Sequence, residues 1–182
     1  ILIRGGSIAA GHGVAKSYAD ILRDKLSARG ACIINRSRFR ETSFDGVDTF
    51  HSDISPFRPD ILLIHFGIDD AFFPVYRSEF KENLVRIVRM ARERFTPRIF
   101  LLTSHPLDDK YEMDAVSIYY RTIREVAVDL DCGLIPVHTW WAGYVEENRL
   151  RNEALVQADA RYPNEKGHEI FSEAVINHLK FY

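Results

Sequence analysis

The first loop of the chain contains a serine with a possible chemical role. The loop reads Gly5-Gly6-Ser7-Ile8-Ala9-Ala10-Gly11-His12-Gly13-Val14, between a strand-like and a helix-like segment. It lacks the spaced glycines of a dinucleotide-binding loop, and His12-Gly13 stands where a phosphate-binding loop needs Lys followed by Ser or Thr. A serine at such a turn can present its hydroxyl as a nucleophile. It can equally be an ordinary turn residue near a helix start.

Three later segments contain further polar groups in a recognisable order. They are residues 35–43, then Phe66-Gly67-Ile68-Asp69-Asp70, and finally Asp159-Ala160-Arg161-Tyr162-Pro163-Asn164 with Gly167-His168. Together with the Ser7 loop, they resemble the four motif blocks of the SGNH/GDSL hydrolase family over nearly the whole chain. This resemblance implies a hydrolase acting mostly on carboxylic esters of lipids, thioesters or acetylated sugars, through a serine, a histidine and an aspartate.

The resemblance also assigns roles to individual residues. Ser7 corresponds to the nucleophile and Asp159 to the triad aspartate, while Tyr162 stands at the place of the triad histidine. The family's oxyanion hole combines the serine N–H with a glycine N–H and an asparagine. Here Arg40 occupies the glycine position and Asp69 the asparagine position.

Tyr162 is the most serious departure from the family pattern. A phenol with a pKa near 10 is only about one part in a thousand ionised at neutral pH, so it is a poor general base. Loss of a triad histidine has cost on the order of a millionfold in turnover elsewhere. We therefore expect ester hydrolysis to be lost or strongly impaired.

Asp69 brings an acidic group, and Arg40 a basic group, to positions of the oxyanion hole where the family has an uncharged asparagine and glycine. An ionised Asp69 accepts hydrogen bonds and repels a developing negative charge, whereas a buried, protonated carboxyl could donate one. Arg40 could form an ion pair with Asp69 or point into solvent. We expect Arg40 or another cation near Asp69, which would keep the carboxylate ionised. A long side chain at a glycine position should also narrow the pocket.

Three histidines lie at or just after the ends of predicted strands: His65, His105 and His138. His105 is the best candidate for a replacement base, although a structural histidine is the more common outcome. The three histidines with Asp69 could in principle bind a metal, but no spacing such as H-x-x-x-H supports this. We expect neither a metal nor another cofactor. His12 gives no usable signal.

The elements that must position these residues alternate along the chain. Strand-like segments are predicted at 1–4, 31–35, 61–66, 99–103 and 134–137, and helical stripes at 14–26, 80–91, 116–130 and 170–179. Apolar strands separated by amphipathic helices predict a parallel sheet covered on both faces. The family resemblance adds the flavodoxin-like three-layer α/β/α sandwich with a five-stranded sheet. Ligands of such sheets lie beyond the carboxyl ends of the strands.

Bulk properties limit the possible partners. The 182 residues suit one domain, 1–182, and the net charge of −2 comes from mixed charges that indicate neither nucleic acid nor a membrane surface as a partner. Cys32 and Cys132 each lie at the start of a predicted strand, and the strand order of the resembled family puts these strands at opposite edges of the sheet. We therefore predict two unpaired, buried cysteines. The sequence predicts neither compartment nor oligomeric state.

Aromatic side chains gather in two segments at the expected mouth of the site. They are Phe72, Phe73 and Tyr76 in one segment and Trp140, Trp141 and Tyr144 in the other. They could wall a pocket for an acyl chain or stack on a sugar. Core packing or a dimer contact explains them as well and is the favoured interpretation.

The leading interpretation is an SGNH/GDSL-type hydrolase relative that keeps the Ser7 pocket for a small ester, acyl or carbohydrate ligand. The alternative is an active serine esterase or acylhydrolase that uses Ser7 with a base such as His105 and a protonated Asp69. A structural or assembly domain is a third possibility. In the first two cases Ser7, Asp159 and Tyr162 should converge at the carboxyl edge of the sheet.

Overall fold

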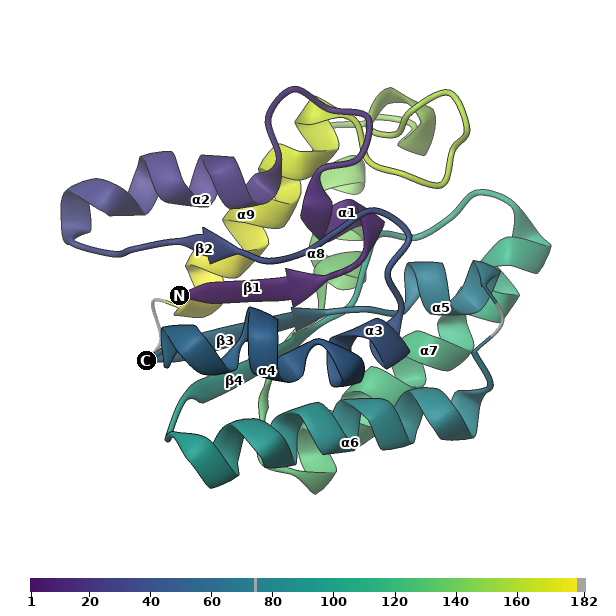
Figure 1. Cartoon of the computed structure of the whole chain (residues 1–182). Coiled ribbons are helices and arrows are strands. Elements are labelled where there is room, and N and C mark those ends of the chain that lie inside the picture. The colour runs from purple at the N-terminus through teal and green to yellow at the C-terminus, as the bar shows by residue number, and fades with distance from the viewer. Residues whose placement is uncertain (74, 180–182) are drawn as a thin grey trace.

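Five parallel strands form one central sheet in a computed structural model that describes residues 1–73 and 75–179. The strand order is β2-β1-β3-β4-β5. The strands are β1 (Leu2–Gly5), β2 (Ile34–Asn35), β3 (Ile61–His65), β4 (Arg98–Leu102) and β5 (Gly133–Ile135). Figure 1 shows β1 and β3 side by side at the centre of the sheet.

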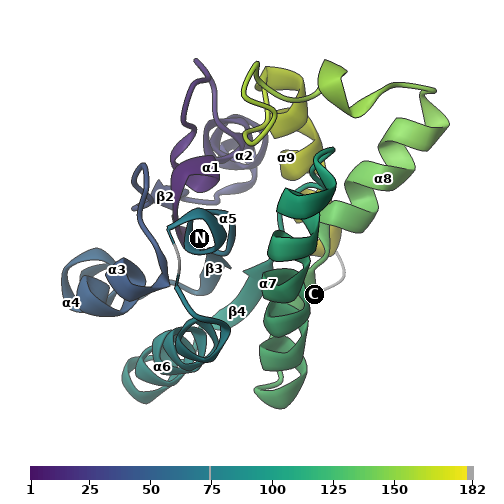
Figure 2. The same ribbon diagram turned by 90° about the vertical axis from the view of Figure 1, so that its right-hand side faces the viewer.

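Helices cover both faces of this sheet. Their bounds are α1 (Ser7–Ala10), α2 (Tyr18–Leu26), α3 (Ser43–Asp48), α4 (Phe50–Asp53), α5 (Ile68–Phe72), α6 (Arg77–Arg94), α7 (Lys110–Asp129), α8 (Val137–Glu147) and α9 (Glu165–Leu179), with short 3-10 turns η1 (Ser27–Arg29), η2 (Ser55–Phe57) and η3 (Asn152–Ala154). Helix α9 packs against α2 and α8, while α6 packs against α3 and α7. The two groups form the outer layers that Figure 2 shows on either side of the strands. The fold is the predicted α/β/α sandwich with a five-stranded parallel sheet.

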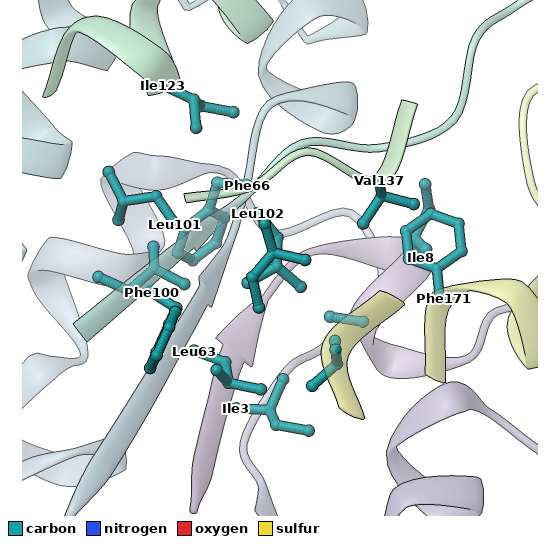
Figure 3. Packing of buried hydrophobic residues seen from close by; sticks show 14 of the residues in the cluster. Ile3, Ile8, Leu63, Phe66, Phe100, Leu101, Leu102, Ile123, Val137 and Phe171 are labelled. Carbon is teal, nitrogen blue, oxygen red and sulfur yellow. The ribbon is translucent and has the colours of Figure 1, made fainter. Parts of the chain in front are cut away.

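The core consists of strand side chains packed between the two helical layers. Leu2, Ile3, Leu62 and Leu63 are fully buried because each central strand has a helical layer on both faces. Figure 3 shows their neighbours from the helices, such as Phe171 of α9. No helix among the described residues is long and apolar enough to cross a membrane.

Several local predictions need correction. No helix was predicted between residues 130 and 170, but residues 138–144 belong to α8. Residues 14–17 of a predicted helical stripe precede α2, which begins after the Ser17 cap. Cys32 is exposed and Cys132 only half-buried, although both are unpaired as predicted. The expectation of burial was wrong because the edge strands β2 and β5 are short and each has a neighbour on one side only.

Candidate active site

Ser7 begins α1, the single helical turn that follows β1, and its side chain is fully buried. The chain reaches this point through Gly6, which lies tightly between two other segments. A Cβ at Gly6 would lie 2.1 Å from the Asp69 Oδ2 and 2.4 Å from the Glu41 carbonyl oxygen. Any larger residue would displace one of these groups, so Gly6 allows the Asp69 carboxylate to approach the Ser7 turn.

Asp69 holds both polar groups of Ser7. The Ser7 N–H donates to Oδ2 of Asp69 at 2.7 Å, and the Ser7 hydroxyl donates to Oδ1 at 2.6 Å. Asp69 reaches this position from the first turn of α5, just beyond the end of β3. Because β1 and β3 are neighbours in the sheet, their carboxyl ends bring the two residues together.

Arg40 contributes its backbone to the same contact. Its N–H donates to the Ser7 Oγ at 2.9 Å. Its φ is +65°, the left-handed region in which glycine is favoured, so Arg40 keeps the backbone conformation expected of the glycine it replaces. The two backbone donors expected in an oxyanion hole are thus Ser7 N–H and Arg40 N–H, and both already donate to groups of the protein.

The predicted ion pair between Arg40 and Asp69 does not form. The Arg40 guanidinium instead lies over two aromatic rings, 5.5 Å from the Phe39 centroid and 5.0 Å from the Phe73 centroid. Burial raises the pKa of Asp69, and the hydrogen bonds from Ser7 and the nearby His12 and Tyr162 offset this only in part. Arg40 is therefore not the cation beside Asp69, and burial is the largest influence on the pKa of this carboxyl.

Tyr162 lies next to both partners of this contact. Its phenol influences the pKa of Asp69, and the Ser7 hydroxyl and Asp69 carboxylate in turn influence the pKa of Tyr162. Burial raises the pKa of Tyr162 above its ordinary value of 10, and the negative charges of Asp69 and Asp159 add to the effect. The phenol is consequently an even weaker base near neutral pH than a free tyrosine.

Asp159 lies on the outer side of Tyr162. It is exposed, and its Oδ1 accepts a hydrogen bond from the Arg161 N–H at 3.1 Å. Its charge reaches the Tyr162 phenol. The structure therefore brings Ser7, Asp69, Tyr162 and Asp159 to one edge of the sheet.

A pocket of about 380 Å³ opens beside these residues. Its walls are His12, Phe39, Arg40, Phe72, Phe73, Glu112, Asp159, Arg161 and Tyr162. Of the two aromatic segments, the one at Phe72 and Phe73 lines this pocket. In the other, Trp141 is fully buried in the core, where its indole N–H donates to Asn152, and Trp140 lies in a separate pocket with Tyr144.

His12, like Phe39 and Glu112, lines this pocket without having been identified from the sequence. Its ring stacks on Phe39 with centroids 3.8 Å apart and meets the edge of Tyr162 at 5.2 Å. Gln157 ties the two loops together, because its side chain donates to the His12 carbonyl and its backbone N–H donates to the Tyr162 carbonyl. The only signal for His12 was its position between Gly11 and Gly13, which does not fix the direction of the histidine side chain.

Asp70, the neighbour of Asp69, has a structural position. Its carboxylate accepts the Ser43 N–H at 2.8 Å and the Gly67 N–H at 2.9 Å, so it ties α3 to the start of α5. Burial raises the pKa of Asp70 to about 6.

None of the three strand-end histidines, His65, His105 and His138, hydrogen-bonds the Ser7 hydroxyl. His65 bridges the Tyr18 hydroxyl and the Ser104 hydroxyl, and His138 contacts the Thr103 hydroxyl. His105 is fully buried, with its ring 4.9 Å from the Trp141 centroid and 6.1 Å from that of Phe171, and neither of its nitrogens has a hydrogen-bond partner. Burial lowers the pKa of His105 to about 3.

The Ser7 hydroxyl donates a hydrogen bond to the Asp69 carboxylate. The Ser7 N–H, which would donate to an oxyanion, donates to the same carboxylate. Across the described residues, no cluster of three His, Cys, Asp or Glu side chains is arranged to hold a metal ion.

A model of the GDSL-like lipase/acylhydrolase family matches residues 4–170. The chain belongs to this family. A sequence comparison with curated proteins finds no match.

Solved structures of esterases and lipases share the fold of this family member. A catalytic mutant of Axe2, an acetylxylan esterase from Geobacillus stearothermophilus, aligns with a TM-score of 0.86 and 19% identity over 100% of this chain and 94% of that one. LAE5, an alpha/beta hydrolase enzyme from the metagenome of Lake Arreo, gives 0.83 and 20% over 97% and 93%. The lipase/acylhydrolase from Enterococcus faecalis gives 0.81 and 19% over 98% and 94%. At these identities the likeness establishes the fold and leaves the activity open.

Proposed function

We propose that this GDSL-family protein is one domain, 1–182, that has kept the Ser7 pocket and lost most or all ester hydrolysis. In this proposal the pocket binds a small ester, acyl or carbohydrate ligand rather than turning it over. The family membership supports the ligand class, and the aromatic walls formed by Phe39, Phe72 and Phe73 suit the apolar face of a sugar ring or an acyl group.

One observation carries the proposal: the Asp69 carboxylate accepts hydrogen bonds from both the N–H and the hydroxyl of Ser7. A tetrahedral intermediate needs donors at this point, and an ionised acceptor there would repel it. Tyr162 adds to the effect because burial raises the pKa of the only group standing at the histidine position. Ser7 thus lacks both a strong base and a free oxyanion donor.

The active-esterase alternative has one supporting observation, the raised pKa of Asp69. A protonated Asp69 could donate to an oxyanion. This reading still needs a base, and His105 is a poor one because burial lowers its pKa to about 3 and its ring packs on Trp141 and Phe171.

Hydrolysis of short-chain p-nitrophenyl esters tests the proposal. The rate with the unmodified protein should equal that with Ser7→Ala, because background hydrolysis by surface groups is common to both. The assay should be run at pH 7 and at pH 10, since ionisation of Tyr162 would favour turnover only at the higher pH.

A Ser7-dependent rate at pH 7 would overturn the proposal. In that case a His105→Ala variant identifies the base, because its loss of activity would support the alternative. Retained activity in that variant would direct attention to another group of the pocket.

A further inference from the structure

Arg40 differs from the other arginines near Ser7 in lacking a carboxylate partner. Arg4, Arg36 and Arg38 each form ion pairs with Asp53, and Arg161 pairs with Glu112. None of the ion pairs between described residues includes Arg40. Its guanidinium is the pocket-lining cation whose charge stays uncompensated within the protein.

The backbone at Arg40 is held in a costly conformation. A φ of +65° disfavours every residue with a Cβ and costs on the order of 1 kcal/mol or more for a residue such as arginine. Glycine would avoid this cost and keep the N–H that donates to Ser7. Arginine therefore has a conformational cost here that glycine would avoid, and the guanidinium is the feature that glycine would lack.

Two aromatic rings hold the Arg40 side chain over the pocket. The guanidinium carbon lies 5.5 Å from the centroid of Phe39 and 5.0 Å from that of Phe73. Phe39 is itself stacked on His12, so the row His12, Phe39, Arg40 and Phe73 crosses the mouth of the pocket. Contact with flat rings leaves the N–H groups at the rim of a guanidinium free to bind a planar or tetrahedral anion.

Of the other charged groups that line the pocket, Glu112 and Arg161 are paired with each other. Arg161 forms an ion pair with Glu112 and lies 4.4 Å from the Phe72 centroid. Asp159 accepts the Arg161 backbone N–H. Glu112 is thus paired with Arg161, Asp159 has no ion-pair partner among the described residues, and Arg40 is the pocket guanidinium left to attract an anion.

We propose that Arg40 binds the anionic group, a carboxylate or a phosphate, of a small ligand whose body lies in the pocket beside Ser7. This inference rests on the proposed function because it names the ligand class of the same site. Phe39 and Phe73 orient the guanidinium, and the ligand contributes the missing counter-charge. Specificity for an acid over its neutral analogue follows from that one side chain.

Titration followed by NMR chemical shifts of pocket residues tests the inference with matched probes. Glucuronate and glucose differ chiefly by a carboxylate in place of a CH2OH group, and glucose 6-phosphate replaces the carboxylate with a phosphate. The proteins compared are the unmodified chain, Arg40→Gln, Arg40→Lys, and Arg151→Gln as a control that removes one exposed positive charge outside the pocket.

We expect one or both acids to bind more tightly than glucose, and Arg40→Gln to weaken that acid about tenfold or more. Arg151→Gln should change the affinity less than twofold, which separates a contact from a general charge effect. Arg40→Lys distinguishes the two anions: the lysine point charge should restore much of the phosphate affinity but little of the bidentate carboxylate affinity.

Two outcomes would overturn the inference. Equal binding of glucose and the two acids, unchanged in Arg40→Gln, would leave a ligand pocket without anion recognition. The absence of shifts in pocket residues with every probe would remove the anion site. The ester assay with Ser7→Ala stands apart from both results, so a failure here leaves the loss of hydrolysis independently testable.

Discussion

Two polar regions lie at or near the carboxyl edge of the sheet and differ in how their groups are satisfied. Around Ser7, the serine, Asp69 and the Arg40 backbone hydrogen-bond one another. Around Phe171, the rings of His65, His105 and His168 lie within 5.4, 6.1 and 6.2 Å of the phenyl centroid. Both nitrogens of His105 and the Nε2 of His168 have no partner.

The comparison shows that the three imidazoles around Phe171 make no hydrogen bond to the serine, while His12 lines the pocket beside Tyr162. The histidine region is buried, and burial lowers the pKa of His65 and His105 to about 3 and that of His168 to about 4. The serine region has carboxylates and a phenol, whose pKa values burial raises. The Ser7 hydroxyl donates to Asp69 and makes no hydrogen bond to the histidines around Phe171.

The largest expected effect comes from placing an imidazole in the serine region. Tyr162→His combined with Asp69→Asn supplies a base beside Asp159 and an oxyanion donor beside Ser7. Ser7-dependent ester hydrolysis at pH 7 should rise at least about a hundredfold over that of a variant with the donor alone, because a positioned general base contributes about a hundredfold or more. The matched control, Tyr162→Phe with Asp69→Asn, has the donor without the base and should gain far less. Equal gains in both would contradict the role given to position 162.

The histidine region should make folding sensitive to acid. An unfolded histidine takes up a proton near pH 6.5, whereas the three buried rings stay neutral down to about pH 4. Their contribution to stability is thus present above pH 6.5 and is lost as the pH falls. Asp70 opposes this because its folded pKa of about 6 favours proton uptake by the native state. We expect a net loss of about 3–4 kcal/mol in the free energy of unfolding between pH 6.5 and 5, measured by urea titration.

A single substitution tests whether the histidine region affects the chemistry of Ser7. His105→Leu removes two unpartnered buried nitrogens, so it should stabilise the fold at pH 7 by about 1–3 kcal/mol and make stability less dependent on acid. It should leave any chemistry at Ser7 unchanged. His51→Asn at an exposed position serves as the control and should alter neither property. A changed Ser7 reactivity in His105→Leu would mean that the two regions communicate.

The smallest effect concerns the backbone at Arg40. Arg40→Gly and Arg40→Ala both remove the contacts with Phe39 and Phe73, but only glycine suits a φ of +65°. Arg40→Gly should therefore be more stable than Arg40→Ala by about 1 kcal/mol in urea unfolding. If the alanine variant were the more stable one, the strain argued for this position would be absent.

The sequence predicted the strands because apolar periodicity constrains them, and the family resemblance led us to expect Ser7, Asp159 and Tyr162 at one edge of the sheet. It could not predict the partner of Asp69. A carboxylate among Gly6, Arg40 and Ser7 can pair with the guanidinium or accept backbone and hydroxyl donors, and that choice depends on distances set by the whole fold. The place of His12 was equally hidden, since a histidine between two glycines has no periodic pattern to fix its direction.

Labelling with a fluorophosphonate tests the central claim most directly, because this probe reacts with activated serine hydroxyls and spares ordinary ones. At pH 7 we predict no more labelling of the unmodified protein than of Ser7→Ala. Toward pH 10 and above, slow Ser7-dependent labelling would reflect ionisation of Tyr162, whose pKa burial raises. Rapid labelling at pH 7 that disappears in Ser7→Ala would show an activated serine and contradict the account.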